Sequence, residues 1–216
     1  MLFAAFIFDM DGTLLDNMGF HFKIWTEFLG SLGVTIDEPT FARRTVGRVN
    51  AEILRELVSP DLTDEEVKAY SLIKERLYRE AFTPHMKAVP GLELFLERAR
   101  RDHIQLALGT TANQDNVAYV LEGLAIARYF PVVVCSEDIR HGKPDPEIFL
   151  TAASRLGADP AACLVFEDAP YGLEAAHRAG MQAVALTTTF PPERLAHLPG
   201  VRRVVADYTG LDPASL

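Results

Sequence analysis

Apolar residues recur along this chain with two different periods. Continuous apolar runs of strand length occupy residues 3–8 (FAAFIF), 104–110, 131–135, 162–167 and 182–187, with a last short run near 203–206. Between the later runs, apolar residues repeat at helical spacing over 91–102, 113–123, 146–156 and 170–179. Buried strands that alternate with helices are typical of a parallel sheet covered on both faces. The pattern therefore predicts a Rossmann-like, doubly wound α/β fold.

Residues 16–86 show the helical period without a convincing strand. A first helix is indicated by an apolar stripe that ends at Gly33 and comprises Phe20, Ile24, Phe28, Leu29 and Leu32. A second short helix is expected over 50–59 with Asn50 as its N-cap, and a longer one over 63–82. The longer helix begins with a predicted capping box, in which Thr63 and Glu66 each satisfy a free backbone N–H group.

The sequence Val89-Pro90-Gly91 marks the end of this helical stretch and the return to alternating strands and helices. Because the run at 3–8 belongs with the later strands, we expect two domains. The α/β core domain would comprise residues 1–15 and 88–216, and an all-helical domain, residues 16–87, would be inserted into it.

Two carboxylates, Asp9 and Asp11, follow the first apolar run, and Gly12 comes directly after them. Ligands bind at the carboxyl ends of the strands in open parallel sheets, so acidic side chains there are placed for chemistry. Two carboxylates held close together repel, and a divalent cation such as Mg²⁺ relieves that repulsion. Aspartate and glycine also form ordinary turns, so this cluster alone leaves a purely structural role open.

Composition narrows the range of partners. The chain has 216 residues, 49% of them hydrophobic, and a net charge of −9, which argues against nucleic acid because no basic excess exists to neutralise phosphates. Cys135 and Cys163 lack metal-site spacing and lie in apolar runs, so we expect reduced core thiols in a cytoplasmic protein. The N-terminal apolar run has no basic residues before it and is too short to cross a membrane, which favours a strand and no membrane association.

Three further groups of polar residues stand near predicted strand ends or in rigid loops. Thr110 and Thr111 follow the second strand, where hydroxyl and amide groups can hold phosphate oxygens. Lys143 lies in a loop restricted by Pro144. Glu167 and Asp168 close the fourth strand. Each has a simpler explanation as well: a turn before a helix, a surface lysine, and acidic residues that favour a helix N-terminus.

Taken together, these segments resemble the motifs of the haloacid dehalogenase-like hydrolases. DMDGTL matches the first motif, Thr110 falls at the Ser/Thr of the second, GKPDPEIF matches the third, and EDAPYG matches the fourth. The resemblance implies that Asp9 is a nucleophile that becomes phosphorylated and that Asp11 is the general acid/base. It also implies that Thr110, Thr111 and Lys143 bind the phosphoryl group. Mg²⁺ would be held by Asp9, the backbone carbonyl of Asp11, Asp168 and Glu167.

A helical insertion between the first and second motifs resembles the cap of the β-phosphoglucomutase-like group, which includes sugar phosphatases. His21 and Trp25 are four residues apart, share a helix face and fall where that cap has a His and a Trp near the site. This favours a ligand the size of a sugar phosphate, although Trp25 also fits a plain core position.

Other candidate substrate residues rest on weaker signals. Arg48 and Lys74 could bind a distal anionic group, but a solvated helix or loop position explains both residues better. Asn113, which follows the second motif, is a further candidate.

Two departures from the mutase pattern favour hydrolysis over phosphoryl transfer between sugars. The mutase has an Arg three residues after a cap glycine, whereas Gly47 here is followed at that distance by Asn50. Asn17 also replaces a Thr beside the site. We therefore expect a Mg²⁺-dependent phosphatase that acts on a small phosphorylated metabolite, a sugar phosphate, as a monomer or weak dimer. A β-phosphoglucomutase-type mutase is the alternative, and a phosphate-sensing module without turnover is a third.

Overall fold

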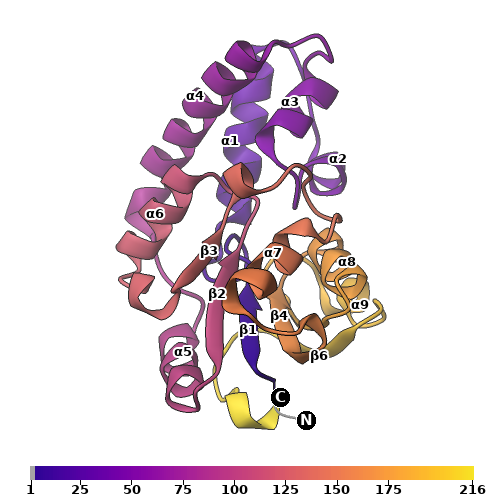
Figure 1. Ribbon diagram of the computed structural model, residues 1–216. Coiled ribbons are helices and arrows are strands. Elements are labelled where there is room, and N and C mark those ends of the chain that lie inside the picture. The colour runs from indigo at the N-terminus through magenta and orange to yellow at the C-terminus, as the bar shows by residue number, and fades with distance from the viewer. Residues whose placement is uncertain (1–2) are drawn as a thin grey trace.

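A computed structural model of the protein, which describes residues 3–216, contains one parallel sheet of six strands (Figure 1). The strands lie in the order β3-β2-β1-β4-β5-β6. Their bounds are Ala5–Phe8 (β1), Gln105–Gly109 (β2), Val132–Val134 (β3), Cys163–Glu167 (β4), Gln182–Leu186 (β5) and Val201–Val205 (β6). Each strand was predicted, and the doubly wound α/β fold is confirmed. Residues 1–2 of the expected core domain lie outside the described part of the chain.

Alternate residues of β1 face two hydrophobic layers, which explains why this strand is apolar throughout. Phe6 and Phe8 pack with α5 (Leu92–Arg101) and α6 (Gln114–Gly123) on one face of the sheet. Ala5 and Ile7 pack with α7 (Glu147–Leu156) and α8 (Pro170–Arg178) on the other face. Because side chains alternate along a strand, a strand covered on both faces needs apolar residues at every position.

The helices of residues 16–87 stand together at the end of the molecule where the strands have their carboxyl ends (Figure 1). They are α1 (Met18–Ser31), α2 (Glu38–Arg44), α3 (Asn50–Leu57) and α4 (Asp64–Phe82). The predicted capping box of Thr63 and Glu66 is present at the start of α4. The helix α2 was not predicted; Asp37 caps its first turn.

The prediction that Asn50 caps the second helix is wrong. Val49 is the N-cap of α3, and Asn50 is the first helical residue. The Asn50 amide instead donates a hydrogen bond of 2.7 Å to Glu75 Oε1, on the neighbouring helix α4. A tertiary contact thus replaces the local cap that Asn residues usually supply.

Short elements complete the chain. They are the helix α9 (Pro192–Leu195) and five 3₁₀ turns, Thr83–His85 (η1), Ala127–Tyr129 (η2), Ser136–Asp138 (η3), Pro160–Ala162 (η4) and Pro213–Ser215 (η5). Both cysteines are free and buried, as expected. None of the helices in residues 3–216 combines the length and apolar character that crossing a bilayer requires.

The two segments that connect the helical insertion to the core lie side by side. The Val89 N–H donates to the Leu14 carbonyl at 2.9 Å, and Leu15 forms an isolated antiparallel bridge with Ala88. The helices of residues 16–87 are therefore joined to the sheet through two adjacent backbone segments.

Candidate active site

The strand order reverses between β1 and β4, and this is where the acidic residues meet. The Asp9 N–H, directly after β1, donates to the Phe166 carbonyl of β4 at 2.9 Å, which fixes the carboxyl ends of the two strands in register. Glu167 ends β4 and Asp168 follows it. In a doubly wound sheet the crevice at this reversal is the usual ligand site.

Lys143 reaches this crevice from the loop before α7. Its ammonium group donates to Asp9 Oδ1 at 2.5 Å and to Glu167 Oε1 at 2.7 Å. The side chain is almost fully buried, so these contacts are shielded from solvent. The expected meeting of the first, third and fourth motifs is therefore present, and a surface role for Lys143 is excluded.

Three carboxylates lie close enough together to share one metal ion. One oxygen from each of Asp9, Glu167 and Asp168 lies within 4.8 Å of the other two. Asp168 Oδ1 accepts a hydrogen bond of 3.3 Å from the Thr13 hydroxyl, whereas its buried Oδ2 has no protein partner. Three buried carboxylates thus face one ammonium group. The excess negative charge and the orphaned oxygen fit a divalent cation with oxygen ligands, and Mg²⁺ is such a cation.

Burial raises the pKa values of two of these carboxyl groups. The pKa of Asp9 rises from 3.8 to about 8, because burial and the charges of Glu167 and Asp11 outweigh the opposing effect of Lys143. The pKa of Asp168 is raised well above 3.8 by burial and by the charges of Glu167 and Asp9. A bound cation would lower both values, because an opposite charge favours the ionised form.

Two glycines allow the acidic residues to approach the backbone. A Cβ atom on Gly12, which has a φ of +81°, would lie 2.1 Å from Asp168 Oδ2. A Cβ atom on Gly172 in α8 would lie 1.8 Å from Glu167 Oε1. The glycines of the first and fourth motifs therefore make room for the carboxylates.

Asp11, two residues after Asp9, has its own partners. Its Oδ1 accepts a hydrogen bond of 2.6 Å from the Asn17 amide and lies 3.6 Å from His21 Nε2. Burial raises the pKa of Asp11, but the proximity of His21 and the hydrogen bond from Asn17 outweigh this effect and lower it below 3.8. Asn17 is held in turn by the Gly12 N–H and by Tyr78. Its side chain therefore orients Asp11.

The residues of the second motif lie at the end of β2. Thr110 is buried and lines the cleft, and its hydroxyl accepts a hydrogen bond of 3.1 Å from the Ala112 N–H. Thr111 also lines the cleft. The Asn113 side chain caps α6 by accepting from the Asn116 N–H at 2.8 Å. Asn116, one turn further along, is the residue of this helix that lines the cleft.

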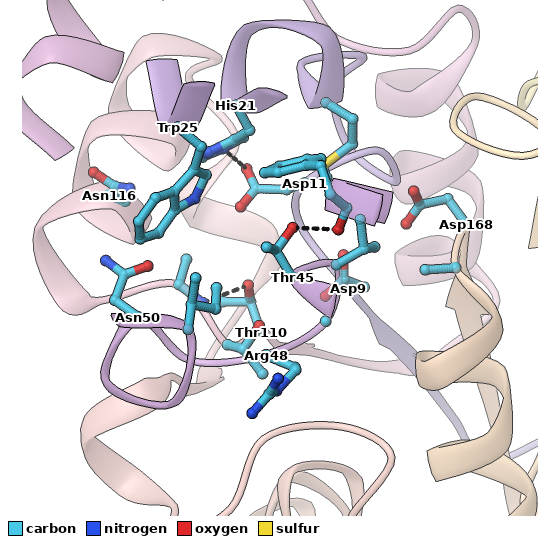
Figure 2. A pocket seen from close by; sticks show the side chains of 18 of the residues that line it. Asp9, Asp11, His21, Trp25, Thr45, Arg48, Asn50, Thr110, Asn116 and Asp168 are labelled. Atoms are coloured by element: carbon cyan, nitrogen blue, oxygen red, sulfur yellow. Dashed lines mark hydrogen bonds and ion pairs between the residues drawn. The ribbon is translucent and has the colours of Figure 1, made fainter. Parts of the chain in front are cut away.

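The helical insertion forms the wall opposite the acidic cluster (Figure 2). His21 and Trp25 of α1 both line the cleft, and Trp25 also packs on Phe28 in the core, so a core position does not remove it from the cleft. The expectation of a solvated position for Lys74 is wrong. Its buried ammonium group donates to Glu75 Oε1 at 2.9 Å and to His21 Nδ1 at 3.1 Å, and lies 4.9 Å from the Trp25 ring centroid.

Arg48 lines the cleft from the loop before α3, but its guanidinium group is already paired. It donates to Glu52 Oε2 at 3.2 Å and makes a further short contact with Glu56 Oε2. The cleft between the two walls has a volume of about 610 Å³, counting the part open to solvent.

The sequence did not identify Glu75, Asn50 and Asn116 as residues of the site. A signal existed for the first of them. Lys74 is four residues before Tyr78 and eight before Phe82, which puts a charge on the buried face of α4. A buried lysine requires an anionic partner, and the adjacent Glu75 is the nearest candidate in the sequence.

Comparison with known proteins agrees with this geometry. A family model described as haloacid dehalogenase-like hydrolase matches residues 6–186. The chain is 32% identical over 182 residues to fructose-1-phosphate phosphatase YqaB of Escherichia coli (strain K12), covering 84% of this chain and 95% of that protein. It is 31% identical over 190 residues to beta-phosphoglucomutase of Bacillus subtilis (strain 168), covering 84% and 82%.

A solved structure with the same fold is similar over almost the entire chain. The crystal structure of beta-phosphoglucomutase from Clostridium difficile superposes with a TM-score of 0.85 and 26% identity, covering 98% of this chain and 94% of that one. The motifs, the geometry and these matches together show that the protein is an enzyme of the haloacid dehalogenase-like hydrolase family.

Proposed function

We propose that the protein is a Mg²⁺-dependent phosphatase that hydrolyses the phosphate monoester of a small sugar through an aspartyl-phosphate on Asp9. The observation that carries the proposal is the convergence of Asp9, Glu167 and Asp168 around Lys143, with Asp11 two residues after Asp9. A nucleophile, a counter-charge and a separate proton carrier are the groups that phosphoryl transfer through a covalent intermediate needs.

The metal would be held by the carboxylates of Asp9 and Asp168, the backbone carbonyl of Asp11, and Glu167 directly or through water. When bound, Mg²⁺ neutralises the charge that develops on the phosphoryl oxygens. Lys143 adds a compact positive charge beside Asp9, and the Thr110 hydroxyl and the Thr111 amide, from residues that line the cleft, would hold phosphoryl oxygens. These groups orient the phosphoryl group for attack in line.

In the first step a carboxylate oxygen of Asp9 forms a bond to phosphorus while the bond from phosphorus to the sugar oxygen breaks. Asp11 gives a proton to that oxygen, and the sugar leaves as an alcohol. Because the pKa of Asp11 is lowered in the ligand-free protein, Asp11 can carry this proton only if the negative charge of the bound phosphate raises that pKa. In the second step the ionised Asp11 takes a proton from water as the water oxygen bonds to phosphorus. The Asp9–phosphorus bond then breaks, which restores the Asp9 carboxylate and releases phosphate.

We also propose that residues 16–87 form a cap domain that opens to admit the substrate and closes over it. The side-by-side connections at Leu14–Leu15 and Ala88–Val89 provide one hinge region for this motion. Comparison of ligand-free and ligand-bound crystals tests it; an identical position of the insertion in both would contradict it.

A panel of substrates tests the proposed function. Phosphate release would be measured with hexose phosphates, phosphoglycolate and p-nitrophenyl phosphate, with and without Mg²⁺. We expect release that requires Mg²⁺ and is fastest with a sugar phosphate. Rapid acid quenching and borohydride reduction, followed by mass spectrometry, should locate the trapped aspartyl-phosphate at Asp9.

The same panel separates the alternatives. Conversion of β-glucose 1-phosphate to glucose 6-phosphate that needs a bisphosphate primer would indicate a mutase. That outcome is a real alternative because the matched relatives include a phosphatase and a mutase at nearly equal identity. Bound Mg²⁺ without turnover of any ester would indicate a phosphate-sensing module.

A further inference from the structure

On the wall that faces the phosphoryl site across the cleft, the cationic side chains are already paired with carboxylates. Within the described residues, the Lys and Arg side chains on this wall of the cleft are Arg48 and Lys74. Lys74 is balanced by Glu75, and Arg48 is balanced by Glu52 and Glu56. The positive charge on this wall is therefore neutralised within the protein.

Glu75 is the centre of this arrangement. Its Oε1 accepts from Lys74 at 2.9 Å and from the Asn50 amide at 2.7 Å, and its Oε2 accepts from the Asn116 amide at 2.7 Å. Burial raises the pKa of Glu75, but the charges of Lys74 and His21 and the hydrogen bond from Asn50 outweigh this effect and lower it to about 2. The carboxylate is therefore ionised at neutral pH.

The orientation of the surrounding amides is also fixed. Arg79 donates to Asn116 Oδ1 at 2.7 Å, so the NH₂ group of Asn116 must face Glu75. Figure 2 shows Asn50, Asn116 and Trp25 on the same side of the cleft, with His21 above Asp11. These residues come from α3, α6 and α1, so a ligand portion bound here would contact three different elements.

We propose, on the basis of the function proposed above, that Glu75 determines specificity by making this wall select an uncharged, hydroxyl-bearing ligand portion and reject a second phosphate group. The substrate class is then a monophosphate of a polyhydroxylated alcohol or sugar, and bisphosphates are excluded. A second phosphate would meet a buried carboxylate, and the two cations that line this wall are neutralised by carboxylates, so binding is electrostatically unfavourable at low dielectric.

Hydroxyl groups fit the same wall better. Amide, imidazole and ammonium groups hydrogen-bond to neutral oxygen atoms without needing a net charge, and the Trp25 ring provides an apolar surface for the carbon face of a sugar. Specificity of this kind combines favourable contacts with the correct ligand and repulsion of the wrong one.

Binding to the Asp9→Asn variant, which should not turn over, measures this selectivity directly. Isothermal titration calorimetry with Mg²⁺ would compare glucose 1-phosphate with glucose 1,6-bisphosphate and fructose 1-phosphate with fructose 1,6-bisphosphate. We expect each preferred monophosphate to bind at least about tenfold more tightly than its bisphosphate, as expected for one repulsive charge in a partly buried site.

Two changes in the wall should reduce that ratio. Glu75→Gln removes the carboxylate, and Asn50→Arg keeps the carboxylate but replaces its amide partner with a cation. We expect bisphosphate affinity to rise about tenfold in either variant while monophosphate affinity changes less. The matched control is Glu80→Gln on the same helix, because Glu80 is exposed and pairs only loosely with Arg76 at 3.9 Å. The ratio should stay unchanged in this control.

The outcomes are distinguishable. Equal binding of mono- and bisphosphates by the parent variant, or an unchanged ratio in Asn50→Arg and in folded Glu75→Gln, would overturn the role of Glu75 while leaving phosphatase activity standing. If the otherwise unmodified enzyme releases no phosphate from any monoester, including p-nitrophenyl phosphate, the proposed function fails and takes this inference with it.

Discussion

Both walls of the cleft contain buried carboxylates and a buried lysine, but the charges are balanced only on the helical wall. At the strand ends, Asp9, Glu167 and Asp168 face one ammonium group, and an oxygen of Asp168 has no protein partner. On the helical wall, Glu75 accepts three hydrogen bonds and Lys74 is paired. The first wall leaves excess negative charge and a carboxylate oxygen without a partner, whereas on the second wall the charges of Lys74 and Glu75 balance each other. Removal of a charge should therefore affect activity on the first wall and stability on the second.

The largest expected effect is on turnover. Asp9→Asn should reduce kcat by about 10³-fold or more, because an amide is a poor nucleophile. Its unfolding free energy should not fall, because Lys143 keeps Glu167 as a partner and one of three mutually repelling carboxylates is gone. Steady-state kinetics and urea denaturation measure the two quantities. Near-normal turnover would refute the assignment of Asp9 as nucleophile.

The second largest effect is expected on the unfolding free energy. Lys74→Met should lower the unfolding free energy by about 3 kcal/mol, because it leaves Glu75 buried with only amide partners. Urea denaturation at neutral pH measures the loss. The double variant Lys74→Met/Glu75→Gln should recover part of it, since no uncompensated charge remains. A single variant as stable as the parent would show that the wall does not depend on this pair.

Acid should reduce the stability that the pair of Lys74 and Glu75 contributes. The pKa of Glu75 falls from 4.5 when unfolded to about 2 when folded. A lowered folded pKa adds stability above pH 4.5 that is lost as the pH falls toward 2. The difference in unfolding free energy between the parent and Glu75→Gln should therefore shrink by up to about 2 kcal/mol between about pH 6 and about pH 3. With Glu80→Gln as the control, the corresponding difference should change little over this range.

A smaller effect on stability is expected when Mg²⁺ binds to Asp9, Glu167 and Asp168. Mg²⁺ at about ten times its Kd should raise the unfolding free energy by about 1.4 kcal/mol, because it binds only the folded protein. Thermal unfolding with Mg²⁺ and with EDTA measures this shift. Asp168→Asn should abolish it. An equal shift in that variant would mean that the ion binds elsewhere.

The acidic wall was predictable from the sequence and the helical wall was not, for a physical reason. Asp9, Thr110, Glu167 and Asp168 each stand at the end of an apolar strand, and parallel strands bring their carboxyl ends to one edge. The positions of the motifs after the predicted strands were therefore enough to predict that these four residues meet. Lys143 was predicted through its motif, although burial could not be inferred from the residue type.

The helical wall depends on how helices far apart in the sequence pack together. Asn50 appeared to be a helix cap because that is a local preference of asparagine, but its amide is directed to Glu75 on another helix. Arg48 appeared free to bind an anion, and only the fold shows that Glu52 and Glu56 neutralise it. The helix α2 escaped prediction because seven residues give too short a stretch to establish a period.

The smallest expected effect tests the connection between the two walls. The Tyr171 hydroxyl on α8 donates to the Arg43 carbonyl on α2 at 3.0 Å, and so joins the core to the helical insertion. Tyr171→Phe should weaken the closed arrangement by about 1 kcal/mol, the usual net value of one hydrogen bond. If closure completes the site, KM should rise a few-fold with little change in kcat. Tyr70→Phe, within the insertion where Tyr70 packs on Phe28, is the matched control. Equal KM values in both variants would mean that this bond does not contribute to closure.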